Sequence, residues 1–177
     1  MKKSLPWLIV AALVLVIGTS ATVAYFVSPP QSVQNTFTVG SVSISLKETT
    51  GSSYKLIPGA DLMKDPAVTV KSGSEACWLF VSIKKSNGFD NYCTFQIREE
   101  WTPLAGVSGV YYRSVDGSGV DRVYRILKND RVYVRQTLTE EELNAITVNP
   151  ELSITAYAVQ SQGVSTPEEA WSILNEE

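Results

Sequence analysis

The sequence contains no histidine, and this absence excludes several kinds of active site. Zinc sites with imidazole ligands, HExxH protease helices, Ser-His-Asp triads and Cys-His nucleophiles all require that residue. Carboxylates alone can still catalyse glycoside hydrolysis. The acidic residues, however, lie in short runs at Glu99-Glu100, Glu140-Glu141-Glu142 and Glu168-Glu169, which are typical of helix caps and solvated edges. We therefore expect a protein that is not an enzyme and has no catalytic, cofactor-binding or metal-binding residues.

Cysteine is also scarce, with only Cys77 and Cys93 in the chain. In an oxidising compartment a disulfide between them could contribute about 3 kcal/mol. If the chain forms a simple hairpin at Asn87-Gly88, however, the two cysteines lie at unequal distances from the turn, and their separation exceeds the ~7 Å Cα limit for a bridge. Two interpretations stay open: a Cys77–Cys93 disulfide, or two buried free thiols, which this geometry favours.

The first residues are typical of an export signal. Lys2 and Lys3 precede an apolar run without charge over residues 5–17. Small residues then follow in Thr22-Val23-Ala24, at the positions that signal peptidase reads. We predict a signal peptide over residues 1–24, cleaved between Ala24 and Tyr25, and hence a secreted protein.

A retained membrane anchor is the alternative, because the uncharged stretch continues through Val27 and a membrane-spanning helix needs about 20 residues. Only this segment would then meet the membrane. Removing Lys2 and Lys3 from the 15 basic residues leaves 13 against 18 acidic ones, so the formal net charge moves from -3 to about -5. Nucleic acid is therefore not an expected partner.

Residues 25–34 predict an extended N-terminal arm, since Pro29-Pro30 cannot continue a helix and the segment has no packing pattern. Its first residues, Tyr25, Phe26 and Val27, are apolar and β-prone, and signal removal would leave them at a free terminus. We expect this tripeptide to take part in assembly by strand addition to a neighbouring copy.

The remainder, residues 35–177, predicts one all-β domain. Phe37 and Val39 alternate in one frame and Ile44 and Leu46 in the other, so the shift at Gly40-Ser41 predicts a bulge or bend inside one long strand. Further strand-like runs cover residues 67–70, 77–83, 92–97, 110–115, 120–126, 131–136 and 152–160. Turn residues separate the runs at Pro58-Gly59, Asn87-Gly88, Asp116-Gly117-Ser118-Gly119 and Asn129-Asp130, the last suited to a two-residue hairpin.

About eight short strands with little helix between them favour antiparallel pairing. We predict an antiparallel β-sandwich, jelly-roll or immunoglobulin-like, with short peripheral helices. Capping boxes predict two of these helices, one after Thr139 with Glu142 and one after Thr166 with Glu169. In the second, Trp171 and Leu174 share a face, which predicts a C-terminal helix packed on the sandwich.

Two patterns allow a functional interpretation beside a structural one. The loop of residues 116–121 has oxygen ligands at alternate positions, as calcium requires, but it lacks a distal bidentate Glu, and we favour a hairpin turn. A second set is aromatic and could stack on a sugar, although alternation along strands also places such residues in a core, which we favour. Its members are Trp78, Trp101, Tyr111, Tyr112 and Tyr133.

Several segments resemble the TasA/camelysin family, small exported proteins of Firmicutes with SipW-type signal peptides. The resemblance spans nearly the whole chain and rests on Ala24-Tyr25-Phe26, Asn35-Thr36-Phe37-Thr38-Val39-Gly40, Pro58-Gly59 with Asp65-Pro66, Gly109-Val110-Tyr111-Tyr112-Arg113, and Thr155-Ala156-Tyr157-Ala158-Val159-Gln160 before Glu169-Ala170-Trp171. It implies a jelly-roll protein of the Gram-positive envelope or matrix, some relatives of which form biofilm fibres. The chain departs from the family at Pro29-Pro30, where relatives tend to carry polar residues.

We therefore expect a structural protein of the cell surface or extracellular biofilm matrix, processed by a signal peptidase of the SipW type. Its expected partners are further copies of itself or paralogous matrix subunits, joined into a fibre by N-terminal strand donation. One alternative is a secreted glycan- or protein-binding module, which would expose a row of Trp and Tyr on one face. The other is a camelysin-like metalloendopeptidase, which would need a metal site built from carboxylates alone because histidine is absent.

Overall fold

The structure is a computed structural model, and it describes residues 37–39, 42–51 and 53–175. The chain divides into two compact units, Met1–Val33 and Gln34–Glu177. The first unit lies outside the described residues, as do the predicted signal peptide, the cleavage site at Ala24 and Tyr25, and the arm with Tyr25, Phe26 and Val27. The description below concerns the second unit.

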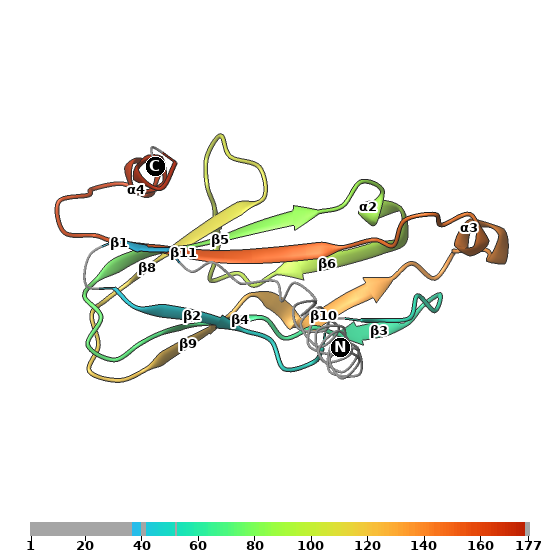
Figure 1. Cartoon of the computed structure of the whole chain (residues 1–177), viewed down its shortest axis with the longest axis horizontal. Helices are drawn as coiled ribbons and strands as arrows, with labels where there is room; N and C mark the ends of the chain where they lie inside the picture. Colours follow the sequence, from blue (N-terminus) through green and yellow to red (C-terminus); the bar gives the residue numbers. More distant parts are fainter. Residues whose placement is uncertain (1–36, 40–41, 52, 176–177) are drawn as a thin grey trace, which may run out of the picture. The chain divides into compact units, whose positions relative to one another are not determined.

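A five-stranded sheet forms one layer of this unit (Figure 1). Its strands lie in the order β1-β11-β5-β8-β7, with bounds Phe37–Val39, Leu152–Gln160, Cys77–Lys85, Val110–Val115 and Thr102–Pro103. The central strand β5 pairs antiparallel with β11 on one side and with β8 on the other. The start of β8 lies so close to β5 that a Cβ on Gly109, where φ is 75°, would be 2.6 Å from the carbonyl oxygen of Ile83. Only glycine fits there.

Two three-stranded antiparallel sheets complete the β structure of the described residues. One contains β2 (Ile44–Lys47), β4 (Ala67–Val70) and β9 (Arg122–Arg125), and the other contains β3 (Asp61–Met63), β10 (Leu127–Val134) and β6 (Cys93–Ile97). The chain passes from the first of these sheets to the second at Ile126, whose N–H donates to the carbonyl of Pro66 at 3.1 Å and whose carbonyl accepts from Arg98 at 3.0 Å.

The main core lies where the five-stranded sheet packs against the two smaller sheets. Alternate residues of β5 face it, including Leu79 and Val81, both fully buried. The smaller sheets supply Val68, Leu46 and Leu127, and the inner face of β11 supplies alanines. Strict alternation along these strands places one apolar set in this core and leaves the other set for the opposite face.

The outer face of the five-stranded sheet carries a second core under helix α4 (Pro167–Ile173). Phe80 and Val159 are buried there against Ala170, which is fully buried. The other helices of the described residues are short: α2 (Phe89–Tyr92) and α3 (Glu140–Asn144), of which α3 buries no residue. The predicted all-β sandwich with short peripheral helices is therefore confirmed, with sheets antiparallel except for the β1–β11 pair.

The prediction of one long strand from Phe37 to Leu46 was wrong. β1 belongs to the five-stranded sheet and β2 to a smaller one, so the frame shift at Gly40-Ser41 marks a change of sheet. The hairpin at Asn87-Gly88 was also wrong, because β5 and β6 lie in different sheets and α2 follows that turn. At Asn129-Asp130 both residues have positive φ, as a turn predicts, but they form an irregularity inside β10 and close no hairpin.

Candidate functional site: the β1–β11 edge

Strand β11 is bordered very differently on its two sides. On one side it pairs with β5 along its whole length, from Leu152 to Gln160. On the other side it pairs only with β1, over Tyr157, Ala158 and Val159. No strand among the described residues pairs with positions 152–156 on that side. An edge of this kind offers free N–H and C=O groups to another strand.

Strand β1 is the element that covers this edge. It has three residues, and its pairing with β11 is parallel, whereas every other strand pair of the described residues is antiparallel. Parallel pairing is slightly less stable per residue, and a three-residue strand forms few hydrogen bonds. β1 also leads the described chain, so one of its ends is connected only to the N-terminal segment. The edge is therefore covered by a short, parallel strand that makes few hydrogen bonds with it.

Helix α4 borders the same edge from the outer face. The rings of Tyr157 and Trp171 meet edge to face with centroids 5.5 Å apart, and Trp171 also lies 5.2 Å from Phe80. The connection from β11 to α4 is held by Trp78, whose indole N–H donates to the carbonyl of Val164 at 3.1 Å. Aromatic residues thus cover the outer face of β11, the strand with which β1 pairs.

The helix itself begins largely as predicted. The Thr166 side chain accepts from the N–H of Glu169 at 3.2 Å, and Pro167 occupies the first turn. The Glu169 carboxylate, however, accepts from Ser165 at 3.0 Å, so the predicted capping box is only half formed. At α3 the box between Thr139 and Glu142 is complete and is confirmed.

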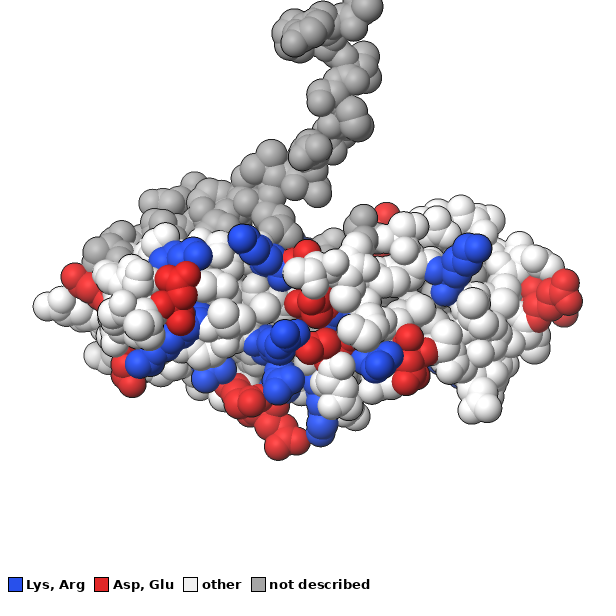
Figure 2. Space-filling view, turned by 90° about the horizontal axis from the view of Figure 1, so that it is seen from below, with Lys and Arg blue, Asp and Glu red and all other residues white. Residues whose placement is uncertain are grey.

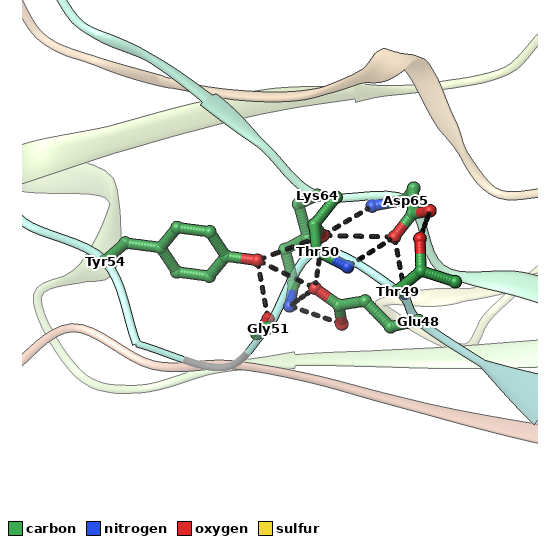
Figure 3. A network of polar contacts seen from close by, with 7 residues as sticks. All are labelled: Glu48, Thr49, Thr50, Gly51, Tyr54, Lys64 and Asp65. Carbon is green, nitrogen blue, oxygen red and sulfur yellow. Dashed lines mark hydrogen bonds and ion pairs between the residues drawn. The ribbon is translucent and has the colours of Figure 1, made fainter.

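A polar network where β2 ends is the other concentration of interacting groups (Figure 3). Lys64 donates to Glu48 at 2.8 Å, and the Tyr54 hydroxyl donates to the same carboxylate at 2.9 Å. Asp65 accepts from the N–H of Thr49 at 2.8 Å and from its hydroxyl at 2.5 Å. The network fastens the segment after β2 to the connection between β3 and β4.

Its electrostatics indicate a structural role. Hydrogen bonds from Thr49, and then from Thr50, lower the pKa of Asp65 to about 2, which keeps that carboxylate ionised. Burial raises the pKa of Tyr54 above its ordinary value of 10.0. Both acidic side chains, Glu48 and Asp65, accept hydrogen bonds from donors of this chain. Sequence reasoning missed this network because its members come from separate segments.

In the loop of residues 116–121, Asp121 has a structural role. The Asp121 carboxylate accepts from the N–H of Ser72 at 2.8 Å and from Lys71 at 2.9 Å, and these bonds lower its pKa. The loop also exchanges backbone hydrogen bonds with the segment around Gly73. No group of three acids, cysteines or histidines that could hold a metal ion occurs among the described residues.

Cys77 and Cys93 are both buried, and each is a free thiol. The first lies opposite Val115 and Gln160 in the five-stranded sheet, and the second lies opposite Val134 in a smaller sheet. The hairpin on which we based their separation does not exist. Burial raises the pKa of Cys77 to about 11 and also raises that of Cys93, so neither thiol is poised to act as a nucleophile.

The aromatic set is dispersed and does not form a single platform. Trp101 is buried, and its indole N–H donates to the carbonyl of Arg125 at 2.9 Å. Tyr111 packs against the main core, whereas Trp78 and Tyr112 belong to the core under α4. Tyr133 is half-buried on β10. Trp101 also faces the guanidinium of Arg113 at 5.6 Å, which lies 4.1 Å from the ring of Tyr124.

Charges of the two signs are interspersed on the face seen in Figure 2. Several of the charged residues form ion pairs with one another: Lys71 with Asp121, Arg125 with Asp130, and Lys128 with Glu99. Among the described residues, no helix has the length and apolar character needed to cross a membrane.

Comparison of the chain with models of protein families, with curated proteins and with solved structures gives no match.

Proposed function

We propose that the chain is an exported structural protein of the cell surface or biofilm matrix, whose copies join by donating their N-terminal segment to β11 of a neighbour. The observation that carries the proposal is the coverage of β11, where only three residues of β1 pair with its outer edge in the described structure. A strand that is short, that pairs in parallel and that is joined to the rest of the described domain at one end only is suited to exchange.

The donated segment comprises the arm of residues 25–34 and β1. When β1 leaves its own domain, the edge of β11 loses its pairing over residues 157–159, which lengthens the stretch where no described strand pairs with this edge. A neighbour's β1 restores the same hydrogen bonds, so exchange costs little free energy at high protein concentration. Positions 152–156 then offer backbone groups to the arm that precedes β1.

Donation of this kind is head to tail, because the donor segment and the acceptor edge are different surfaces. Heterologous contacts that do not close into a ring extend into filaments. The mature arm begins with the apolar residues Tyr25-Phe26-Val27, so its burial against a neighbouring copy is favourable. The sequence resemblance to TasA/camelysin-type proteins, which include fibre-forming members, favours the same function.

Deletion of residues 25–34 from the mature chain tests the role of the arm. We expect concentrated mature protein to form filaments in electron micrographs, and the shortened chain to stay monomeric with an unchanged monomer melting temperature. Filaments that still form without the arm would remove it from the assembly mechanism. No filaments or oligomers from the intact mature chain at any concentration would overturn the proposal itself.

Crosslinking tests the exchange of β1 directly. Val39 lies in register with Val159, so one chain carrying Val39→Cys and a second carrying Val159→Cys can form a disulfide only when β1 passes between molecules. We expect a mixed dimer after assembly and oxidation, identified by intact mass. A matched pair with Val39→Cys and Ser153→Cys, which is out of register, should give far less dimer. Equal yields from both pairs would contradict exchange in this register.

A further inference from the structure

A row of aromatic residues crosses the outer face of the five-stranded sheet and ends at the position of β1. Tyr112 lies opposite Phe80, and Phe80 lies opposite Tyr157. The next position in this row belongs to β1, where residue 37 is in register with Tyr157. Residue 39 is in register with Val159, which belongs to the same outer face.

Helix α4 covers the end of that row. Trp171 contacts both Phe80 and Tyr157, with ring centroids 5.2 Å and 5.5 Å away. The helix packs onto the sheet at Ala170, which is fully buried in the same core cluster as Val159. α4 therefore packs against β11, the strand with which β1 pairs, and the indole of Trp171 lies beside the ring of Tyr157.

The inner face beside the same edge is different. Ala158 is fully buried in the main core, and Ala156 is 2 % exposed. A strand paired with β11 thus lies next to aromatic residues on the outer face of β11 and next to small, closely packed residues on its inner face. Its first and third positions suit large apolar residues, and its middle position suits a small one.

We propose that Trp171 of α4 selects the strand that pairs with β11, by favouring an aromatic residue in register with Tyr157. The partner is a segment with the pattern aromatic, small, β-branched apolar, which a second copy of this chain carries as Phe37-Thr38-Val39. This inference rests on the proposed donation for the identity of the donor. The selection itself operates on whichever β1 occupies the position, including the chain's own.

The full mature chain kept dilute and monomeric provides the test, through hydrogen exchange of the β11 amides that face β1. Trp171→Ala should lower their protection about fivefold, and Trp171→Phe should restore most of it, since an aromatic pair contributes on that scale. Ile173→Ala is the matched control, because it also removes apolar surface from α4 but removes no aromatic ring. An equal loss in Ile173→Ala would mean that α4 acts only by covering the sheet.

A double substitution separates selection from general loosening of the helix. If Trp171 selects residue 37, Phe37→Ser should lower protection about fivefold in the parent and hardly at all in the Trp171→Ala chain. Fully additive losses would overturn the inference. This readout is intramolecular, so the two proposals can fail separately. An absence of filaments would reject the proposed function and leave the result on Trp171 standing. Additive losses with intact filaments would reject only the selection by Trp171.

Discussion

Leu79 and Phe80 are neighbours in β5, and both are fully buried, yet they belong to different cores. Leu79 faces the main core, which joins all three sheets of the described residues and is largely aliphatic. Phe80 faces the core under α4, where its ring meets Tyr112 and Trp171. Burial alone does not distinguish the two residues, but the elements that cover them do.

The difference bears on function. The main core lies between sheets that pair along their strands, so we expect it to open only when the domain unfolds. The core under α4 is closed by seven helical residues on a connection from β11, and it lies beside the edge where β1 pairs. The strand exchange proposed above would benefit from this arrangement, because the region beside β1 could then open while the main core stays intact.

The largest expected effect is that of Leu79→Ala. It creates a cavity between paired sheets that cannot collapse easily, and such substitutions cost about 2–5 kcal/mol. We expect a loss of about 3 kcal/mol in the free energy of unfolding, measured by urea denaturation, with α4 and β11 unfolding together with the rest. A loss below about 1 kcal/mol would show that the sheets relax around the cavity and that the main core is not the rigid one.

Truncation of a buried phenylalanine to alanine typically costs about 3–5 kcal/mol, but Phe80→Ala should cost less, about 2 kcal/mol, because α4 can settle toward the sheet and reduce the cavity. Its second consequence is local: amide exchange in α4 should accelerate by more than exchange in β4, which is not part of that core. If exchange in β4 accelerates as much as in α4, the two cores behave as one cooperative unit and the comparison fails.

Clean alternation between turn residues made some strands predictable from sequence. The runs at residues 67–70, 110–115 and 152–160 coincide with β4, β8 and β11. The same signal failed between Phe37 and Leu46, because period-two alternation reports which face is buried and not which sheet a strand joins. β3 and β7, with three and two residues, are too short to show a period.

The candidate site was predicted in part. The strand at 152–160 was recognised from its sequence, but the parallel pairing of β1 with β11 was not, because it depends on a contact across more than a hundred residues. The assembly role expected of Tyr25 to Val27 stays a prediction, since these residues lie outside the described part of the chain. The packing of Trp171 was predicted from helical spacing and is confirmed. Its contact with Tyr157, in register with residue 37, needed the sheet order, which local sequence does not encode.

Thr166→Ala should produce a smaller effect, confined to the core under α4. The substitution removes the acceptor for the Glu169 N–H, and loss of such a cap costs about 1 kcal/mol. We expect faster exchange of the Ala170 amide and little change in global unfolding. Thr139→Ala is the matched control, because it removes the cap of α3, which buries no residue. A global loss in Thr166→Ala larger than in Phe80→Ala would contradict the view that α4 opens separately.

Acid should loosen the region beside the main core before it loosens the core under α4. Asp65 fastens the end of β2 beside the main core, and hydrogen bonds from Thr49 and Thr50 lower its pKa from 3.8 to about 2. The stability that this ionised carboxylate contributes is fully present above pH 3.8 and is lost as the pH falls toward about 2. Because the group is partly solvated, we expect its contribution at neutral pH to be below about 1 kcal/mol.

Asp65→Asn should therefore lower stability at neutral pH and make the unfolding free energy less steep between pH 3.8 and about 2, where the two chains converge. Thr49→Val, which removes the hydroxyl donor and keeps the N–H, should give an intermediate slope. Urea denaturation at several pH values measures both effects, and amide exchange at Thr50 and Ala170 locates them. If acid released Ala170 of α4 before Thr50 in the parent chain, the core under α4 would be the acid-sensitive region, and Asp65 would not account for the slope.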